Sequence, residues 1–246
     1  MNYKMNSNLI LNTAFVSASL LLRAQAQVFT ENFNSGASPL WGNENGSWSA
    51  AGGVYRANVP GNSPQAFSSL PFNLTDFTMD IDINGITDGG IWLHSTPRPG
   101  TSVGVSGVLL VLKNPNGSLG TVCWQTSSDG NTMSPLLNQS SPPYAPGSNP
   151  HLHIEVSGNV YSLFLNGSVD PVTSLVTSSF PNGRVALYDN SSESFDNVVL
   201  QPVPEPASFS LLGLALGGFL LHRRRIRRLD LSGYLDAERR TGAHPC

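Results

Sequence analysis

Hydrophobic and polar residues alternate along the middle of the chain with a period of two. Residues 77–84 (Phe-Thr-Met-Asp-Ile-Asp-Ile-Asn) follow this pattern throughout, and residues 151–156 (His-Leu-His-Ile-Glu-Val) repeat it. Successive side chains of a strand point to opposite faces of a sheet, so each segment predicts a strand with one buried and one solvated face. Residues 27–201 show no sustained helical period, and the pattern predicts an all-β antiparallel sandwich.

Turn signals divide the other hydrophobic runs into further strands. Residues 161–165 follow a Ser-Gly-Asn turn at 157–159, which predicts a hairpin with the preceding strand. Residues 108–112 are entirely apolar and predict a strand in the interior of the sandwich. Residues 183–188 and 194–200 supply the strands that close the domain.

The first 26 residues have the pattern of a secretory signal peptide. Lys4 gives a positive start, Leu9–Leu22 is mostly apolar, and Ala24-Gln25-Ala26 supplies the small residues that signal peptidase requires. We expect cleavage after Ala26 and export of the remaining chain.

Three kinds of sequence follow one another in residues 202–228. Prolines at 202, 204 and 206 oppose helix formation, and residues 207–222 are predominantly apolar. A cluster of arginines follows, which consists of Arg223, Arg224, Arg225, Arg227 and Arg228. This order predicts a transmembrane helix at about 207–222 with the arginines on the cytoplasmic side. An ordinary membrane anchor and a buried core helix are the alternatives, and the arginines argue against the core helix.

Val203-Pro204-Glu205-Pro206, the Leu-, Gly- and Ala-rich segment and the arginine cluster together resemble the PEP-CTERM sorting signal of bacteria that make exopolysaccharide. The resemblance implies that a membrane-embedded exosortase recognises Pro204, Glu205 and Pro206. It also implies inner-membrane anchoring during sorting and then passage to the cell surface or extracellular matrix. The polar tail at residues 229–246 departs from such signals, which usually end soon after the arginines.

The composition limits the partners of the predicted domain, residues 27–201. Charged residues make up 12% of the chain. The basic residues of this domain are Arg56, Arg98, Lys113 and Arg184. A nucleic-acid surface needs clustered Lys and Arg, so nucleic acid is excluded as a partner, and we expect a monomeric domain.

Cysteine use predicts a domain without a disulfide. Cys123 and Cys246 are the two cysteines of the chain, and the predicted membrane helix separates them. We expect Cys123 to be buried as a small hydrophobic residue.

Four stretches, taken in order, resemble the concanavalin-like jelly roll found in laminin-G-like domains. These are residues 31–55, 76–93, 153–167 and 183–198. The resemblance implies opening strands, a central pair, a hairpin that ends in an Asn-Gly turn, and a final pair. It also implies that the first and last strands lie side by side.

Domains of this kind often share a structural calcium ion between the first and last strands. Glu31, Asn32 and Asp196 match those positions, with backbone carbonyls near Gly53 as further ligands. Calcium takes six to eight oxygen ligands. The alternative is that Glu31 and Asp196 are solvent-facing polar residues at a sheet edge.

Asp80 and Asp82 share one face of a predicted strand, as the carboxylates of a retaining glycosidase would. The third residue of the motif is Asn84 rather than an acid, and the resemblance would imply glutamates, not aspartates, as nucleophile and acid. Ordinary outward-facing aspartates are therefore the preferred interpretation, and no catalytic residue is predicted.

Trp92 and His94 also share one face of a predicted strand. Aromatic faces stack on sugar rings while His and Asp bond the hydroxyls, so Trp92, His94, Asp80 and Asp82 predict a glycan-binding cleft. The alternative is that the tryptophans belong to the core. His151, His153 and Glu155 repeat every second residue and extend too far to bind one metal ion, which favours a solvated face.

These patterns combine into one functional hypothesis. The chain is expected to be an exported cell-surface or extracellular-matrix protein that binds glycan, in particular extracellular polysaccharide, without cleaving it. The alternatives are a glycoside hydrolase that uses Asp80 and Asp82 and a structural or adhesive matrix protein without a defined ligand.

Overall fold

The computed structural model describes residues 27–113, 120–141, 144–145 and 147–203. The predicted signal peptide, the transmembrane segment and the tail at 229–246 lie outside the described residues. The described part contains β-strands and no helix. The strands are β1 (Phe29–Glu31), β2 (Trp48–Ala51), β3 (Val54–Ala57), β4 (Ala66–Ser69), β5 (Phe77–Asn84), β6 (Asp88–Pro97), β7 (Val105–Lys113), β8 (Thr121–Ser127), β9 (Leu137–Ser140), β10 (His151–Ser157), β11 (Val160–Leu165), β12 (Thr173–Val176), β13 (Arg184–Asp189) and β14 (Ser194–Pro202).

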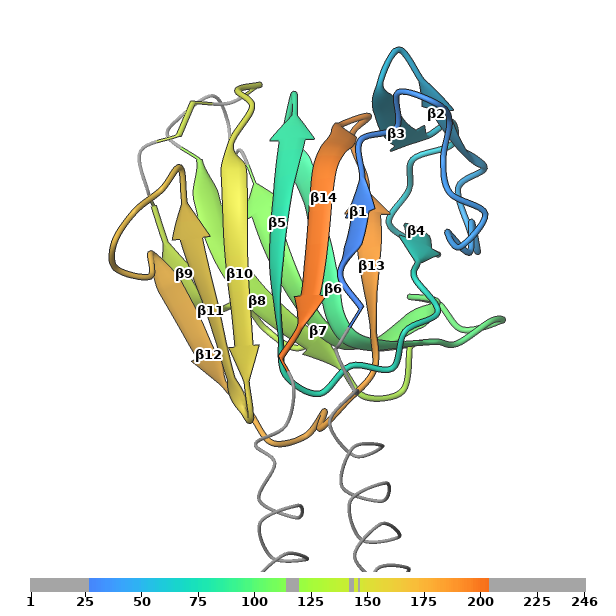
Figure 1. Ribbon diagram of the computed structural model, residues 1–246. Coiled ribbons are helices and arrows are strands. Elements are labelled where there is room, and N and C mark those ends of the chain that lie inside the picture. The colour runs from blue at the N-terminus through green and yellow to red at the C-terminus, as the bar shows by residue number, and fades with distance from the viewer. Residues whose placement is uncertain (1–26, 114–119, 142–143, 146, 204–246) are drawn as a thin grey trace, which may run out of the picture. The chain divides into compact units, whose positions relative to one another are not determined.

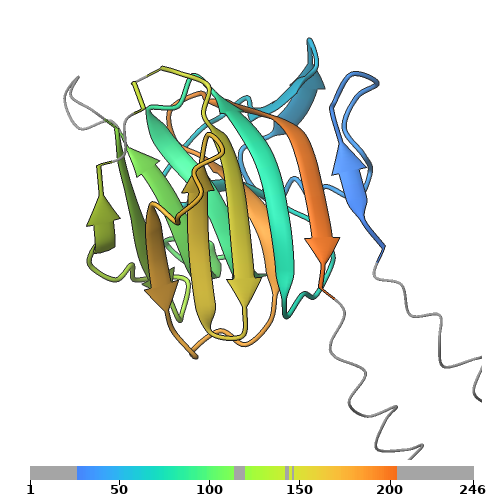
Figure 2. The same cartoon turned by 60° about the vertical axis from the view of Figure 1, so that its left-hand side comes forward.

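The strands form two antiparallel sheets that face one another as two layers (Figures 1 and 2). The eight-stranded sheet has the order β12-β11-β10-β5-β14-β3-β2, with β1 paired to β14. The six-stranded sheet has the order β4-β13-β6-β7-β8-β9. The predicted all-β antiparallel sandwich is therefore confirmed.

The main core lies between the two sheets. The predicted alternation in β5 is confirmed, because Met79 and Ile81 are fully buried while the residues between them are partly exposed. The facing sheet contributes Ile91 and Leu110, and Trp124 fills the space beneath β12, where its indole N–H donates to Thr173 Oγ1 at 3.2 Å. Residues 27–203 thus contain a complete core of their own, so we expect this segment to fold independently.

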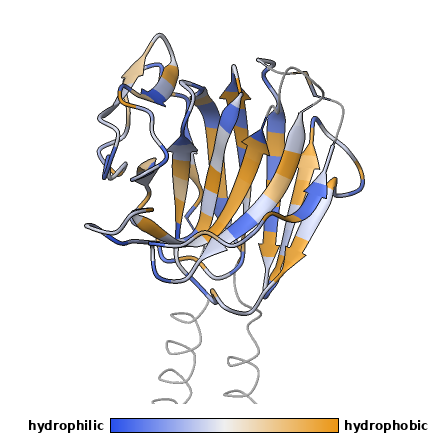
Figure 3. Cartoon of the chain, turned by 180° about the vertical axis from the view of Figure 1, so that it is seen from behind, coloured by the Kyte–Doolittle hydropathy of each residue, from blue (hydrophilic) through white to orange (hydrophobic). Residues whose placement is uncertain are grey.

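A second hydrophobic cluster lies on the outer face of the six-stranded sheet. The strands of this sheet contain many hydrophobic positions, coloured orange in Figure 3. The cluster contains Trp92, Leu109 and Cys123, together with Phe67 and Tyr188. Residues 108–112, the apolar run predicted for the interior, lie in β7. Their side chains consequently pack against hydrophobic partners on both faces of the sheet. Cys123 is fully buried, as predicted. The eight-stranded sheet keeps an outer face with polar, partly exposed residues.

The strand pairings match the expected jelly roll in two respects. β10 and β11 form the predicted hairpin, with Leu152 opposite Leu165. The first and last strands lie side by side, with Phe29 opposite Leu200. The strands of the predicted central and final pairs do not bond to each other, because β5 and β14 lie in one sheet while β6 and β13 lie in the other.

Two carboxyl groups are buried where the chain crosses from β13 to β14. Asp189 accepts hydrogen bonds from the backbone N–H groups of Ala57 (3.2 Å) and Ser192 (2.8 Å), and Glu193 accepts one from Ser191 Oγ (2.6 Å). Burial raises the pKa of Asp189 to about 6. Burial, and then the nearby Asp189 charge, raise the pKa of Glu193 to about 8.

The raised pKa of Glu193 predicts a pH-dependent stability. A carboxyl group with a higher pKa in the folded than in the unfolded state binds more protons when folded, so the free energy of unfolding falls as pH rises from 4.5 to about 8. The substitution Glu193→Gln removes this titration. Thermal melting at pH 5 and pH 8 should show a smaller loss of stability in E193Q than in the original protein, and equal losses would contradict the assignment.

Candidate functional site

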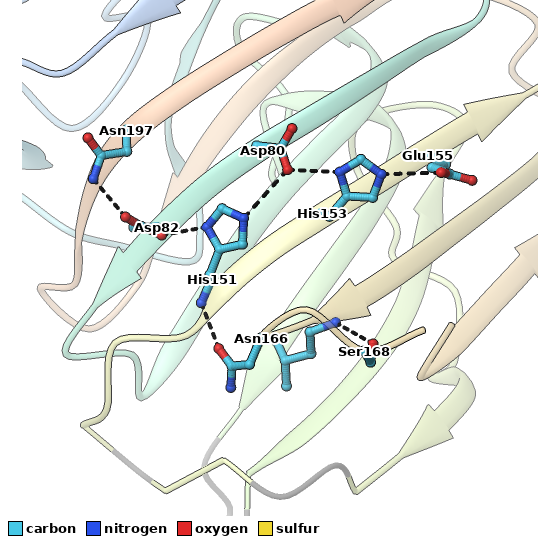
Figure 4. Close-up of polar contacts among 9 residues, drawn as sticks. Asp80, Asp82, His151, His153, Glu155, Asn166, Ser168 and Asn197 are labelled. Carbon is cyan, nitrogen blue, oxygen red and sulfur yellow. Dashed lines mark hydrogen bonds and ion pairs between the residues drawn. The ribbon is translucent and has the colours of Figure 1, made fainter. Parts of the chain in front are cut away.

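Carboxylates and imidazoles alternate in a row on the outer face of the eight-stranded sheet (Figure 4). The row is Asp82, His151, Asp80, His153 and Glu155, with the aspartates on β5 and the other three residues on β10. The antiparallel register places His151 opposite Asp82 and His153 opposite Asp80. The period of two directs all five side chains to the same face.

Each imidazole of the row lies between two carboxylates. His151 places Nδ1 2.7 Å from Asp82 Oδ1 and Nε2 3.5 Å from Asp80 Oδ1. His153 places Nδ1 2.8 Å from Asp80 Oδ1 and Nε2 3.2 Å from Glu155 Oε1. The row is therefore continuous from Asp82 to Glu155, and protonated imidazoles would form ion pairs along it.

Neighbouring strands extend the row at its sides. Asn197 on β14 donates from Nδ2 to Asp82 Oδ2 at 2.7 Å, next to a β-bulge between Asp196 and Val199. Phe164 on β11 lies opposite His153, and the two ring centroids are 5.6 Å apart. An aromatic ring therefore stands beside the carboxylates and imidazoles on the same face.

The charges of the row affect the protonation of His153. Partial burial lowers the pKa of His153, but the hydrogen bonds to Asp80 and Glu155 together outweigh burial, and the pKa is raised above its ordinary value. The side chain of His153 is 33% exposed and that of Glu155 is 51% exposed. The row is thus open to solvent and to a ligand.

The glycan-binding cleft predicted from Trp92, His94, Asp80 and Asp82 is not formed by these four residues. Asp80 and Asp82 share the outer face of the eight-stranded sheet, as predicted. Trp92 is fully buried in the cluster on the far side of the six-stranded sheet, where its indole N–H donates to Gln65 Oε1 at 2.8 Å. The alternative interpretation, in which the tryptophan is a core residue, describes Trp92 correctly.

A bulge in β6 explains the misplacement of His94. The register shifts between Leu93 and Thr96, and His94 has a φ of 45°, so the alternation of faces is broken there. The imidazole turns into the interior, where it lies 2.7 Å from Tyr161 Oη and 2.8 Å from the Thr75 carbonyl oxygen. Burial lowers the pKa of His94, which is typical of a core histidine.

Residues 202–225 match the PEP-CTERM protein-sorting motif. The chain carries a PEP-CTERM motif. The match begins at Pro202, the last residue of β14, and includes the Pro204-Glu205-Pro206 sequence. A PEP-CTERM motif indicates export and membrane-anchored sorting by an exosortase before surface display. No curated protein sequence matches the chain.

Solved structures similar to this PEP-CTERM protein include a carbohydrate-binding module and a lectin-like domain. Carbohydrate-binding module CBM66 from Bacillus subtilis is 20% identical, and the match covers 66% of this chain and 95% of that chain with a TM-score of 0.54. The exoplasmic/lumenal domain of VIP36, in a Ca²⁺/Man2-bound form, is 12% identical, and the match covers 73% of this chain and 88% of that chain with a TM-score of 0.51.

An enzyme is also among the similar structures. The GH43 protein BlXynB from Bacillus licheniformis is 9% identical with a TM-score of 0.53. The match covers 71% of this chain but only 39% of that protein. At these identities the likeness shows the fold alone, and the fold is a jelly roll of the carbohydrate-binding-module type. The chain therefore combines a PEP-CTERM sorting motif with a jelly-roll domain whose fold is similar to that of a carbohydrate-binding module.

Within the described segments between residues 27 and 203, there is no helix long and apolar enough to cross a membrane. The transmembrane helix predicted at 207–222 lies outside those segments.

The residues predicted to bind calcium have other partners. Glu31 accepts backbone N–H groups with both carboxylate oxygens, from Phe33 at 3.1 Å and from Ser38 at 2.8 Å. Asn32 and Asp196 likewise accept backbone N–H groups from the residues that follow them. Within the described segments, no group of three or more His, Cys, Asp and Glu residues is arranged to hold a metal ion. Glu31 therefore anchors the loop at Phe33 and Ser38, and calcium binding by Glu31, Asn32 and Asp196 stays a prediction.

Sequence reasoning did not identify the partners of Asp80 and Asp82. His151 and His153 were expected to form a solvated face, and Phe164 was assigned no role. The register of β5, β10 and β11 brings these residues together, and strand pairing between distant segments has no local signal in the sequence. The alternation of residues 77–84 and of residues 151–156 was the signal from which a polar face shared by the two strands could have been found.

Removal of the Trp92 side chain should affect folding and not the outer row. Trp92→Ala leaves a large cavity, so we expect a loss of about 3–5 kcal/mol in the free energy of unfolding. Trp92→Phe, which loses mainly the bond to Gln65, should cost less. Denaturant unfolding of both variants tests this, and an unfolding free energy unchanged in W92A would contradict the buried position.

The two roles considered for Glu31 can be separated by thermal melting. Glu31→Ala leaves two backbone N–H groups without their acceptor, and we expect a loss of about 1–3 kcal/mol. Addition of EDTA to the original protein should leave its melting temperature unchanged. A fall in melting temperature with EDTA, absent in E31A, would support the calcium assignment.

Proposed function

We propose that the sandwich domain binds glycan without cleaving it, and that the outer face of the eight-stranded sheet is the binding surface. The observation that carries this proposal is the open row from Asp82 to Glu155 with Phe164 beside it. Such a combination of hydrogen-bonding groups and an aromatic ring suits a sugar, which presents hydroxyl groups at its edge and C–H groups on its faces.

The charges of this face select the class of glycan. Asp80, Asp82 and Glu155 accept hydrogen bonds from hydroxyl or amine groups. The strands β5, β10, β11 and β14 contain no Lys or Arg. An acidic polysaccharide would bring its own carboxylates close to those of the row, so the face favours uncharged or amine-bearing polysaccharide.

Binding without cleavage is supported by the partners of Asp80 and Asp82. Glycosidases need one carboxylic acid that holds its proton for transfer to the leaving group. Both aspartates here accept hydrogen bonds from imidazoles and are about one third exposed, at 35% and 29%. Neither carboxyl group lies in the apolar, enclosed setting in which a glycosidase keeps its acid protonated. A glycoside hydrolase that uses Asp80 and Asp82 is the second candidate, because the two side chains share an open face.

The location proposed for this activity follows from the PEP-CTERM motif. Signal peptidase releases the chain after Ala26, and an exosortase acts near Pro204-Glu205-Pro206 at the inner membrane. The sandwich then reaches the cell surface or extracellular matrix, where the extracellular polysaccharide of the producing cell is the ligand nearest to it. The domain acts as a monomer.

A separate pocket provides a competing location for glycan. It has a volume of about 490 Å³ and is lined by Phe67, Pro64, Pro97 and Pro99 with Glu44 and Thr101. Most of its lining is apolar, and both Glu44 carboxylate oxygens are hydrogen-bonded to Ser69. Few polar groups are therefore free to bond hydroxyls, and the outer row is the preferred surface.

Binding of residues 27–203 to immobilised polysaccharides tests the proposal. Dextran, cellulose and chitosan represent uncharged and amine-bearing ligands, and alginate is the acidic comparison. We expect binding to at least one of the first three, with Phe164→Ala weakening it about tenfold through the lost stacking surface. Pro99→Ala, in the competing pocket, is the control variant and should bind as the original protein does.

Four outcomes separate the candidate functions. Loss of binding in P99A but not in F164A would move the site to the pocket. Release of reducing ends from the polysaccharide, abolished by Asp80→Asn, would favour the hydrolase. Binding to alginate alone would contradict the charge argument. Failure to bind any polysaccharide would leave the structural or adhesive matrix protein.

A further inference from the structure

We propose that His153 makes glycan binding at the outer row proton-dependent. The protonated imidazole holds Asp80 and Glu155 to one another, and the neutral imidazole releases one of them to the hydroxyl groups of a glycan. This inference rests on the proposed function and adds regulation to the same site.

The hydrogen-bond geometry of His153 is that of the protonated ring. A neutral imidazole has one N–H donor and one acceptor nitrogen, whereas the protonated ring has two donors. A carboxylate is an acceptor only. Nδ1 and Nε2 of His153 each face a carboxylate oxygen, of Asp80 at 2.8 Å and of Glu155 at 3.2 Å. Both contacts are hydrogen bonds only when both nitrogens carry a proton.

His151 has the same arrangement with one shorter and one longer contact. Its Nδ1 lies 2.7 Å from Asp82, and its Nε2 lies 3.5 Å from the same Asp80 oxygen that His153 contacts. Asp80 is therefore shared by both imidazoles. With both rings protonated, two positive charges offset the three carboxylates of the row and occupy oxygen atoms of each carboxylate.

The neighbouring strands offer no other cation to these carboxylates. β5 contributes Asp80 and Asp82, β10 contributes Glu155, and β14 contributes Asp196 opposite Asp82. β11 contributes no charged residue and places Phe164 against His153. Apart from His151, every charged group that these four strands bring to His153 is thus a carboxylate, which favours its protonated ring.

Loss of the proton from His153 turns one of its two hydrogen bonds into a repulsive contact. The deprotonated nitrogen presents a lone pair to a carboxylate oxygen, and the two repel each other. Glu155 is the most exposed member of the row and contacts it through His153 alone. Its carboxylate is therefore the first to be released as an acceptor for sugar hydroxyls, two residues along β10 from His153, which lies opposite Asp80 and Phe164.

The direction of the pH effect follows from this competition. At low pH the protonated ring of His153 occupies Asp80 and Glu155, so a glycan has to displace it. In the protein without glycan, the pKa of His153 is raised above the ordinary value of 6.5. Affinity should therefore increase as pH rises through and above that value. Each hydrogen bond to a charged group that is regained corresponds to about tenfold in affinity.

The experiment measures affinity of residues 27–203 for dextran, cellulose and chitosan at pH 5.5 and pH 8.5. We expect about tenfold tighter binding at pH 8.5 to dextran or cellulose, whose charge does not change between these pH values. The amines of chitosan lose their own proton over this range, so chitosan reports binding and is left out of the pH comparison. His153→Asn keeps a donor near the position of Nδ1 for Asp80, cannot be protonated and leaves Glu155 free. H153N should therefore bind nearly equally at both pH values. Asp170→Asn changes an exposed loop carboxylate outside the row and should retain the pH dependence.

Proton titration of the histidines, followed by NMR without glycan, supplies a readout that does not depend on binding. His153 should titrate above 6.5, and Asp80→Asn or Glu155→Gln should lower its midpoint. Equal affinity at both pH values, or tighter binding at pH 5.5, would overturn the proton dependence while leaving glycan binding intact. Absence of binding to all three polysaccharides at both pH values would overturn the proposed function and this inference with it.

Discussion

The strict alternation of β5 is the constraint on which the rest of the site depends. This strand lies near the middle of the eight-stranded sheet, between β10 and β14, and it directs Met79 and Ile81 into the core. A shift of one residue in its pairing would expose these side chains and bury Asp80 and Asp82. The hydrophobic contacts of the inner face therefore hold the register that aligns aspartates with histidines on the outer face. The site needs no special backbone of its own.

The two sheets differ in how many of their faces are buried. The six-stranded sheet packs against the core with one face and against the Trp92 cluster with the other. Its strands contain continuous apolar runs such as that in β7, where both faces need hydrophobic partners. The eight-stranded sheet has one solvated face and a regular alternation of hydrophobic and polar residues. The position of the polar row follows from this difference.

The sequence was sufficient to predict the fold class, the hairpin of β10 and β11, and the shared face of Asp80 and Asp82. These features depend on local periodicity and turn residues. The location of His94 could not be predicted, because a bulge at a non-glycine residue breaks the alternation without a sequence signal. Nor could the pairing of His153 with Asp80, since it joins segments more than 70 residues apart whose register is set by the whole core.

The adjacency of β1 and β14 has a mechanical consequence. The PEP-CTERM motif begins at Pro202, the last residue of β14. β14 has a neighbouring strand on each side, β5 and β1. A pull along β14 would load its hydrogen bonds to both neighbours together, in shear. Separation of a strand at the edge of a sheet would instead break such bonds one after another. A domain held at this point would resist such a pull better than one held through an edge strand.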